Sequence, residues 1–179
     1  MKSAKIKPLA ALEKIRADLR KQGKTVVFTN GCFDLIHAGH IRLFEKAKSC
    51  GDVLVVALNS DSSVRKIKGP SRPLFPLRER FEVLAAVEVI DYLTSFSEET
   101  PRKVISTLLP DVLVKGGDWE AGEIVGRTEV EAAGGKVVRA PYLRGHSSTN
   151  LADKIAGNFR KGIEDGRPGR RRAGERFKK

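Results

Sequence analysis

The side chains best suited to chemistry lie in one short segment, residues 31–40, which reads Gly-Cys-Phe-Asp-Leu-Ile-His-Ala-Gly-His. Its two imidazoles, His37 and His40, are three residues apart, so both lie on one side of a helix that begins near them. The first turn of a helix offers free N–H groups and the positive end of the helix dipole, which bind phosphate. Gly39 lets phosphate oxygens approach the backbone. We therefore predict that both imidazoles donate to nucleotide phosphates and stabilise a leaving pyrophosphate.

Two other interpretations of these histidines stay open. In one interpretation His37 and His40 are capping or core residues, and in the other they bind a metal ion together with Cys32. The metal site lacks a fourth ligand nearby and a carboxylate suited to activating water. No base is placed to activate the thiol of Cys32, so we expect a small packed residue beside the nucleotide and no nucleophile.

Strands alternate with helices along the chain, which is typical of βαβ units. This order predicts an α/β fold in a single domain: a Rossmann-like, doubly wound parallel sheet with helices on both faces. Ligands of such sheets bind outside the carboxyl ends of the strands, at the switch point of the strand order. The expected strands are 25–29, 52–58, one near Tyr92, 111–114 and 136–140, and the expected helices are 8–21, 39–49, 77–89, 100–110, 123–133 and one from about Thr149.

Besides residues 30–40, two polar, glycine-bearing segments follow expected strands, at 115–119 and 144–149. Lys115 ends its strand at the ligand edge, and the two glycines after it allow a close approach to a nucleobase. Asp118 is suited to accept a hydrogen bond from a ribose hydroxyl or a base amine. An ordinary strand-ending turn is the alternative. The glycines are Gly116 and Gly117.

Three hydroxyl side chains, Ser147, Ser148 and Thr149, precede the last expected helix. They can cap that helix while their hydroxyl and N–H groups bind the β- and γ-phosphates. A plain capping cluster is the alternative.

A long basic connection spans residues 59–76, and segments of that length in compact domains tend to be binding loops or lids. Its cations suit an acceptor's phosphate and a triphosphate, although each one alone also fits a solvated surface charge. Lys68 is the strongest candidate among them. Arg80, in the first turn of the next helix, is expected to face the same site. The cations of the connection are Arg65, Lys66, Lys68 and Arg72.

The net charge of +12 does not by itself indicate nucleic acid. Residues 166–179 hold seven Arg/Lys and one Glu, so half of the excess lies in a segment broken by Gly and Pro that we expect to be disordered. The start of the chain has no apolar signal region, and the longest apolar run, residues 53–58, is too short to cross a bilayer. The two cysteines show no disulfide spacing, so we expect a cytoplasmic protein without membrane contact.

Several of these motifs resemble a known family. Residues 31–40 resemble the signature of the cytidylyltransferase-like nucleotidyltransferases, which often carry G-T-F-D before H-x-G-H. Residues 114–119 (VKGGDW) resemble a segment of the bacterial heptose 1-phosphate adenylyltransferases, and residues 68–73 (KGPSRP) followed by Arg80 resemble their K-G-x-x-R-P…R stretch. Residues 145–149 (GHSST) resemble their G-x-S-T-T loop. The resemblance covers residues 24–157 in the family's order.

The resemblance implies transfer of AMP from Mg²⁺–ATP to D-glycero-β-D-manno-heptose 1-phosphate, giving ADP-heptose for lipopolysaccharide core or a related surface glycan. It places Asp34 either near the acceptor sugar or in a structural bond to the loop backbone. The catalytic set is then His37, His40 and Lys68, without a metal ligand from the protein. The nucleotide-binding set is Gly31, Cys32, Phe33, His37, Gly39, His40, Lys115, Gly116, Gly117, Asp118, Ser147, Ser148 and Thr149, and the acceptor-binding set is Asp34, Lys68, Arg72 and Arg80.

The remaining expectations concern organisation and partners. We expect an N-terminal helix (1–23) packed on a nucleotidyltransferase domain (24–163), then a basic tail (164–179). Larger family members carry a sugar kinase domain first, so this chain resembles the stand-alone form, with a separate heptose kinase. A homodimer is expected by analogy alone. Ser148, where the family more often has Thr, keeps the hydroxyl, and His146 stands at a variable position.

Rival activities belong to the same superfamily or to another class altogether. They are a cytidylyltransferase for glycerol 3-phosphate or phosphoethanolamine, and a flavin adenylyltransferase. A nucleic-acid-binding protein with residues 166–179 as its arm is the most distant alternative, since it leaves the histidine pair without a purpose.

Overall fold

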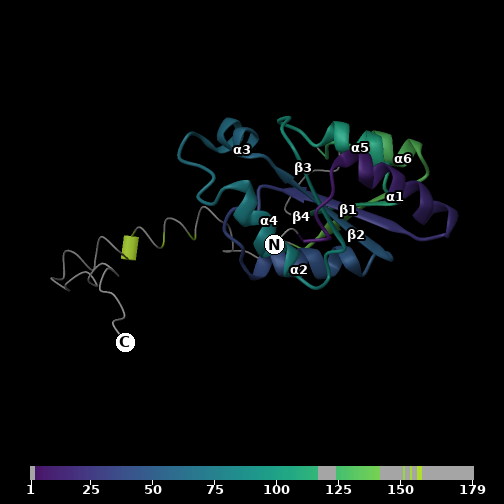
Figure 1. The fold of residues 1–179 in the computed structure, drawn as a ribbon, viewed down its shortest axis with the longest axis horizontal. Coiled ribbons are helices and arrows are strands. Elements are labelled where there is room, and N and C mark those ends of the chain that lie inside the picture. The colour runs from purple at the N-terminus through teal and green to yellow at the C-terminus, as the bar shows by residue number, and fades with distance from the viewer. Residues whose placement is uncertain (1–2, 117–123, 142–150, 152–153, 155–156, 159–179) are drawn as a thin grey trace.

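The computed structural model describes residues 3–116, 124–141, 151, 154, 157 and 158. Five parallel strands form one sheet in the order β3-β2-β1-β4-β5, with helices on both faces (Figure 1). This arrangement confirms the predicted doubly wound sheet. The strands are β1 (Val26–Gly31), β2 (Val53–Asn59), β3 (Tyr92–Phe96), β4 (Val112–Gly116) and β5 (Lys136–Ala140), and the helices are α1 (Leu9–Lys21), α2 (Ala38–Lys48), α3 (Asp61–Lys68), α4 (Leu77–Ala85), α5 (Arg102–Leu108) and α6 (Arg127–Ala132).

The strand order reverses at β1. Its neighbours are β2 on one side, where Val27 pairs with Leu54, and β4 on the other, where Val27 pairs with Val112. The interior strand β2 is buried along all but its first residue, which explains its nearly continuous apolar sequence. The switch point therefore lies between the carboxyl ends of β1 and β4, where such sheets bind ligands.

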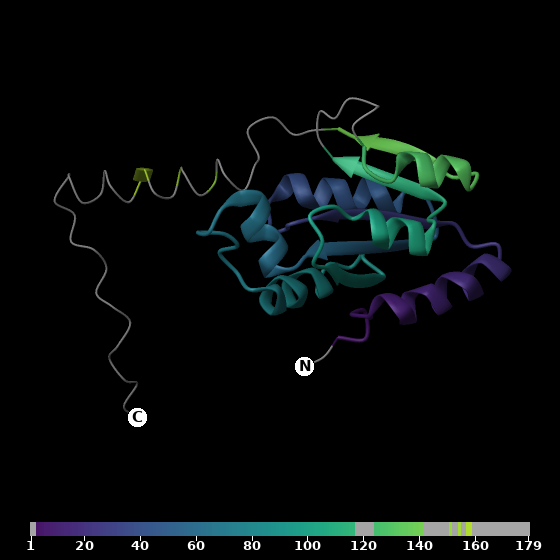
Figure 2. The same ribbon diagram turned by 90° about the horizontal axis from the view of Figure 1, so that it is seen from above.

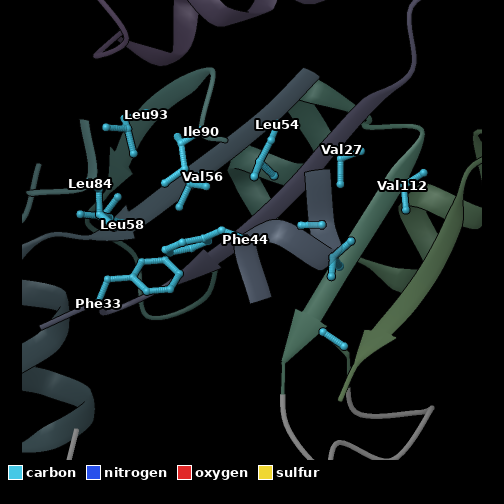
Figure 3. Close-up of a cluster of buried hydrophobic side chains, with 13 residues drawn as sticks. Val27, Phe33, Phe44, Leu54, Val56, Leu58, Leu84, Ile90, Leu93 and Val112 are labelled. Atoms are coloured by element: carbon cyan, nitrogen blue, oxygen red, sulfur yellow. The ribbon is translucent and has the colours of Figure 1, made fainter. Parts of the chain in front are cut away.

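Two apolar cores, one on each face, hold the layers together. On one face α2 and α4 pack through Phe44 and Leu84, which lie with Phe33, Val56 and Leu58 in a single cluster (Figure 3). The opposite face is covered by α1, α5 and α6, whose buried side chains include Leu12, Ile105 and Val130. From above, α4 lies beside β3 and α6 beside β5 at opposite edges of the sheet (Figure 2).

The N-terminal helix α1 is attached by a buried cation as well as by apolar contacts. Arg16, 8% exposed, pairs with the Asp111 carboxylate at 2.7 Å and donates to the carbonyls of Leu108 and Leu109. Asp111 also accepts from the Val26 N–H at the start of β1. The predicted division near residues 23 and 163 stays a prediction, and the basic tail lies outside the described residues.

Some predicted elements differ from the structure. The connection 59–76, expected to be a loop, contains helix α3. Ser60 caps this helix, with its hydroxyl accepting from the Ser63 N–H at 3.3 Å. Helix α5 begins at Arg102, two residues after the expected start at residue 100, and Pro101, whose side chain has no capping group, occupies its N-cap position. Thr149 lies outside the described residues, although residues 151, 154, 157 and 158 are helical.

The other boundaries shift by a few residues. Helix α4 ends at Ala85, short of the expected residue 89, and α6 covers only Arg127–Ala132 of the expected 123–133. Strands β1 and β4 each extend two residues past the predicted end, to Gly31 and Gly116. The extensions bring the predicted ligand-binding segments directly to the carboxyl edge of the sheet.

Candidate active site

The two histidines of the β1–α2 turn lie against each other. His37 is the N-cap residue of α2, with extended φ/ψ of −141° and 170°, and His40 is in the first helical turn. Their rings are stacked, with centroids 3.8 Å apart and planes 21° apart. The structure thus brings together the two imidazoles that the sequence placed on one side of a helix start. Gly39, between them in the chain, is part of the same turn.

His40 is embedded among aromatic rings. Phe33 meets its ring edge-on at 5.3 Å and Phe44 stacks at 6.5 Å. Burial, then the nearby His37 and Lys68, lower the pKa of His40 to about 4. The ring is therefore neutral at pH 7. Its Nδ1 is shielded from solvent and finds no hydrogen-bond partner among the described residues, so Nε2 is the nitrogen left to meet a ligand.

Phe33 packs directly against His40, and Gly31 leaves room for the Phe33 ring. Phe33 is 4% exposed and has a positive φ of 46°, which turns its ring into the core beside Phe44. A Cβ on Gly31 would lie 3.0 Å from that ring, so any larger residue would require the ring to shift by a few tenths of an ångström. Phe33 thus packs against His40 and Gly31 against Phe33, and the nucleotide contact predicted for both residues stays a prediction.

Cys32 is partly buried between the first two strands. Its Sγ lies 3.8 Å from Asn59 Oδ1, and burial raises the pKa of the thiol. The positive charges of Lys68, Arg80 and Arg72 oppose this rise only in part. A thiol in such an environment is a poor nucleophile, as expected from the sequence.

Asp34 binds the connection between α3 and α4. Its carboxylate, almost fully buried, accepts from Arg72 Nη1 at 2.5 Å and from the N–H groups of Leu74 and Phe75 at 2.8 and 3.0 Å. Of the two roles left open for Asp34, the structure shows a structural bond, directed at the backbone of residues 74–75. The side chain of Arg72 is drawn into the same contact.

Arg80 is buried, contrary to the prediction that it faces a substrate. The whole residue is 2% exposed, and its side chain donates to the carbonyls of Phe75, Cys32 and Asn59 and to the Asp61 carboxylate. These bonds occupy most of the guanidinium donors. The correction has a physical cause, because a fully buried guanidinium requires fixed acceptors and finds them in loop carbonyls.

Lys68 lies at the carboxyl end of α3 and is exposed. Its positive charge lowers the pKa of both His40 and Cys32, which is consistent with the predicted place of Lys68 near the β1–α2 turn. Arg65 and Lys66, in the same helical turn, are also exposed.

Lys115 and Asn30 bridge the switch point. The Lys115 ammonium donates to the side-chain oxygen of Asn30, so the bond joins β4 to β1. Burial lowers the pKa of Lys115 to about 8. Within the described part of the chain the lysine has no carboxylate partner, which suits an anionic ligand at this edge. A Cβ added to Gly116, the next residue in the chain, would lie 3.4 Å from the Leu43 side chain.

The predicted nucleotide contacts Gly117, Asp118, Ser147, Ser148 and Thr149 lie outside the described residues. Among the residues that are described, no group of three or more His, Cys, Asp or Glu side chains is placed to hold a metal ion. No helix in these ranges is long and apolar enough to cross a membrane.

Sequence reasoning missed three polar side chains of the site. Asn30 holds Lys115, Asn59 donates to Ser63 Oγ at 2.9 Å, and Asp61 accepts from both Arg80 and the Leu77 N–H. Asn30 and Asn59 are the polar residues at the ends of two apolar strands, a position that would have marked them. Asp61 follows the capping Ser60, a helix-start signal within the supposed loop.

A doubly wound sheet with paired imidazoles at a helix N-terminus defines a class of proteins suited to bind nucleotide phosphates. Within that class, the chain belongs to the cytidylyltransferase-like family, whose model matches residues 28–152. The family resemblance inferred from the motifs is thereby confirmed.

Curated relatives match most of the chain. The bifunctional protein HldE of Syntrophotalea carbinolica is 47% identical over 159 residues, covering 89% of this chain and 32% of that protein. HldE of Geobacter metallireducens is 52% identical over 152 residues, covering 85% and 31%. The chain therefore spans about a third of the length of these relatives.

Two solved structures share the fold. A lipopolysaccharide core biosynthesis protein from Thermoplasma volcanium is 25% identical with a TM-score of 0.56. The match covers 70% of this chain and 100% of that protein's chain. Pantoate-β-alanine ligase from Francisella tularensis, in complex with β-γ ATP and β-alanine, is 20% identical with a TM-score of 0.61, and the match covers 89% of this chain and 78% of the ligase. The ligase supports the fold alone.

Proposed function

We propose that this chain is an adenylyltransferase that transfers AMP from ATP to D-glycero-β-D-manno-heptose 1-phosphate, releasing pyrophosphate and forming ADP-heptose. The observation that carries the proposal is the stacked pair His37 and His40 at the start of α2, beside the switch point of the sheet. The HldE relatives and the lipopolysaccharide core biosynthesis protein support this branch of the family. The heptose-type motifs at residues 68–73 and 114–119 support it as well.

In the proposed reaction a phosphate oxygen of the acceptor attacks the α-phosphorus of ATP in line. A P–O bond forms there, and the bond from the α-phosphorus to the bridging oxygen breaks, so pyrophosphate takes the electron pair. The nucleophile is already anionic, so the reaction needs no general base. Catalysis is then alignment of the two substrates and stabilisation of charge on the leaving group.

Each part of the site has a role in this proposal. His37 and His40 donate to the phosphates of ATP, and neutral His40 does so through Nε2. Lys68 supplies an exposed positive charge between the acceptor phosphate and the triphosphate. Lys115 compensates negative charge of the nucleotide at the switch point. Arg72 binds the phosphate of the acceptor substrate more weakly, because Nη1 of its guanidinium is held by Asp34.

The proposal extends to the nucleotide contacts and the cellular setting. Gly117, Asp118, Ser147, Ser148 and Thr149 complete the nucleotide site, and Mg²⁺ enters with ATP as part of the substrate. The same proposal holds that the enzyme is cytoplasmic and forms a homodimer. It also holds that a separate heptose kinase supplies the acceptor.

The test is pyrophosphate release with Mg²⁺ in a matrix of donors and acceptors. ATP and CTP are each offered with heptose 1-phosphate, glycerol 3-phosphate, phosphoethanolamine and FMN. Release only with ATP and the heptose phosphate supports the proposal. Release with CTP and glycerol 3-phosphate or phosphoethanolamine, or with ATP and FMN, replaces the acceptor and leaves the histidine mechanism in place. No release, together with salt-sensitive binding of RNA or DNA, would leave the nucleic-acid alternative.

A further inference from the structure

Arg80 binds four residues that lie in three separate segments of the chain. Its Nη1 donates to the Cys32 carbonyl at 2.5 Å, just after β1, and its Nη2 donates to the Asn59 carbonyl at 2.9 Å, at the end of β2. The same Nη2 pairs with Asp61 at 2.8 Å in the first turn of α3, and Nε donates to the Phe75 carbonyl at 3.1 Å. The side chain is fully buried, with none of its own surface exposed.

These bonds form a closed hydrogen-bond network between the turn that leads to His37 and the segment that connects α3 to α4. Phe75 is held at both backbone groups: its carbonyl accepts from Arg80, and its N–H donates to Asp34. Asp34 is two residues from Cys32, which Arg80 also holds. The turn that leads to His37 and the segment that carries Arg72 are therefore fixed to each other on two sides.

Asp61 extends the same hydrogen-bond network to α3. Its carboxylate accepts from Arg80 and from the Leu77 N–H at 2.8 Å, at the start of α4. Lys68 is at the opposite end of α3, so the orientation of this eight-residue helix decides where the Lys68 ammonium lies. Figure 1 shows α3 and α4 together at one end of the molecule, connected by the segment that Asp34 and Arg80 hold.

We propose that Arg80 is a positioning residue that sets the place of Lys68 and Arg72 relative to the His37–His40 pair. The inference rests on the proposed nucleotidyl transfer, in which one group of residues binds the triphosphate and the other the acceptor phosphate. Arg80 touches neither substrate. It determines the distance and angle at which the two are presented to each other.

Only arginine can make this set of contacts. The guanidinium is a planar fork whose N–H groups point in several fixed directions, whereas a lysine ammonium is a single point with three donors. Arg80→Lys therefore keeps the positive charge beside Asp61 and loses part of the fork. A displacement of about 1 Å between reacting groups costs about 100-fold in rate. The direct phosphate contacts of ATP remain, so its binding changes little.

The first test is the steady-state kinetics of Arg80→Lys in the full chain. We expect kcat to fall about 10- to 100-fold while KM for ATP changes less than about threefold. Arg78→Lys, two residues earlier on α4 and exposed, is the matched control and keeps wild-type kinetics. A KM increase with unchanged kcat would make Arg80 a ligand contact and overturn the proposal, as would wild-type kinetics in Arg80→Lys.

Asp61→Asn is a second variant that tests the same network if Arg80→Lys does not fold. Asparagine keeps the side-chain oxygen that accepts from Leu77 and loses the charge that faces Arg80. We expect kcat to fall about fivefold, which corresponds to weakening one charge-assisted hydrogen bond. Unchanged kcat in Asp61→Asn together with wild-type kinetics in Arg80→Lys would leave no positioning role for this network.

A second readout is independent of turnover. The chain has three histidines, and the rings of His37 and His40 stack on each other while Phe33 meets the His40 ring edge-on, so their NMR signals depend on this packing. His146→Gln identifies the third signal. Arg80→Lys should move the His37 and His40 signals, and Arg78→Lys should not. Unmoved signals in Arg80→Lys would contradict the inference. Failure of the wild type to turn over any acceptor would instead refute the proposed function, with the NMR result still decisive for Arg80.

Discussion

Arg72 and Asp34 form a 2.5 Å ion pair in which the two side chains are only 10% and 1% exposed. The pair connects the turn after β1 to the segment before α4, 38 residues later in the chain. Two backbone N–H groups, those of Leu74 and Phe75, complete the coordination of the carboxylate. Burial makes such a pair expensive to break, because the partner left behind is an uncompensated charge.

Asp34→Ala should therefore destabilise the fold by about 3–5 kcal/mol. The variant leaves the Arg72 guanidinium and two N–H groups without their acceptor. Denaturant unfolding measures the difference, with Asp18→Ala as control, since Asp18 forms an exposed pair with Lys21 and should contribute under about 1 kcal/mol. A loss below about 1 kcal/mol for Asp34→Ala would contradict the structural role given to this carboxylate.

The low pKa of His40 predicts a pH-dependent loss of stability in acid. The unfolded chain binds a proton at His40 near pH 6.5, whereas the folded chain does so only near pH 4. Between these values the unfolded state carries more protons, so the contribution of His40 to stability falls as pH drops from 6.5 to 4. The loss approaches about 3 kcal/mol and should be missing in His40→Gln.

An NMR titration of the His40 ring checks the same shift directly. The midpoint should lie near pH 4 in the free protein, and a bound ATP analogue should raise it, since negative charge beside the ring favours its protonated form. A midpoint at or above 6.5 in the free protein would mean that the ring is solvated and not packed between Phe33 and Phe44.

Lys115 predicts a pH dependence of nucleotide binding on the alkaline side. The pKa of about 8 means that the free ammonium loses its proton as pH rises through 8, and with it the charge that we assign to the nucleotide. The Kd of a non-hydrolysable ATP analogue should rise about tenfold between pH 7 and pH 9. Lys115→Met should bind more weakly at pH 7 and lack this rise. An equal rise in both proteins would remove Lys115 from the nucleotide site.

Local spacing was sufficient to predict the centre of the site. The three-residue interval between His37 and His40 fixes their side of the helix, and the apolar run of β2 marks a strand buried on both faces. These signals depend on residues a few positions apart. General rules of parallel sheets then predict a ligand site at the carboxyl ends of the strands, whereas the strand order and the place of the switch point come from the structure.

The roles of Asp34 and Arg80 could not be predicted in the same way. Their partners lie up to 48 residues away, and a sequence does not show that an arginine will be buried against carbonyl groups. Helix α3 was missed because it is short and mostly polar, with Val64 as its buried apolar side chain. The contacts predicted at residues 117–118 and 147–149 stay predictions.

The most direct test of the account follows the α-phosphate of ATP. With α-labelled ATP, Mg²⁺ and heptose 1-phosphate, the label should appear in a sugar nucleotide, with one pyrophosphate released per product. His40→Ala should lower this turnover about 10²–10³-fold, the scale for losing one preorganised donor to a developing charge. Label that remains in ATP or passes to ADP, or a His40→Ala rate within about threefold of wild type, would contradict nucleotidyl transfer at the His37–His40 pair.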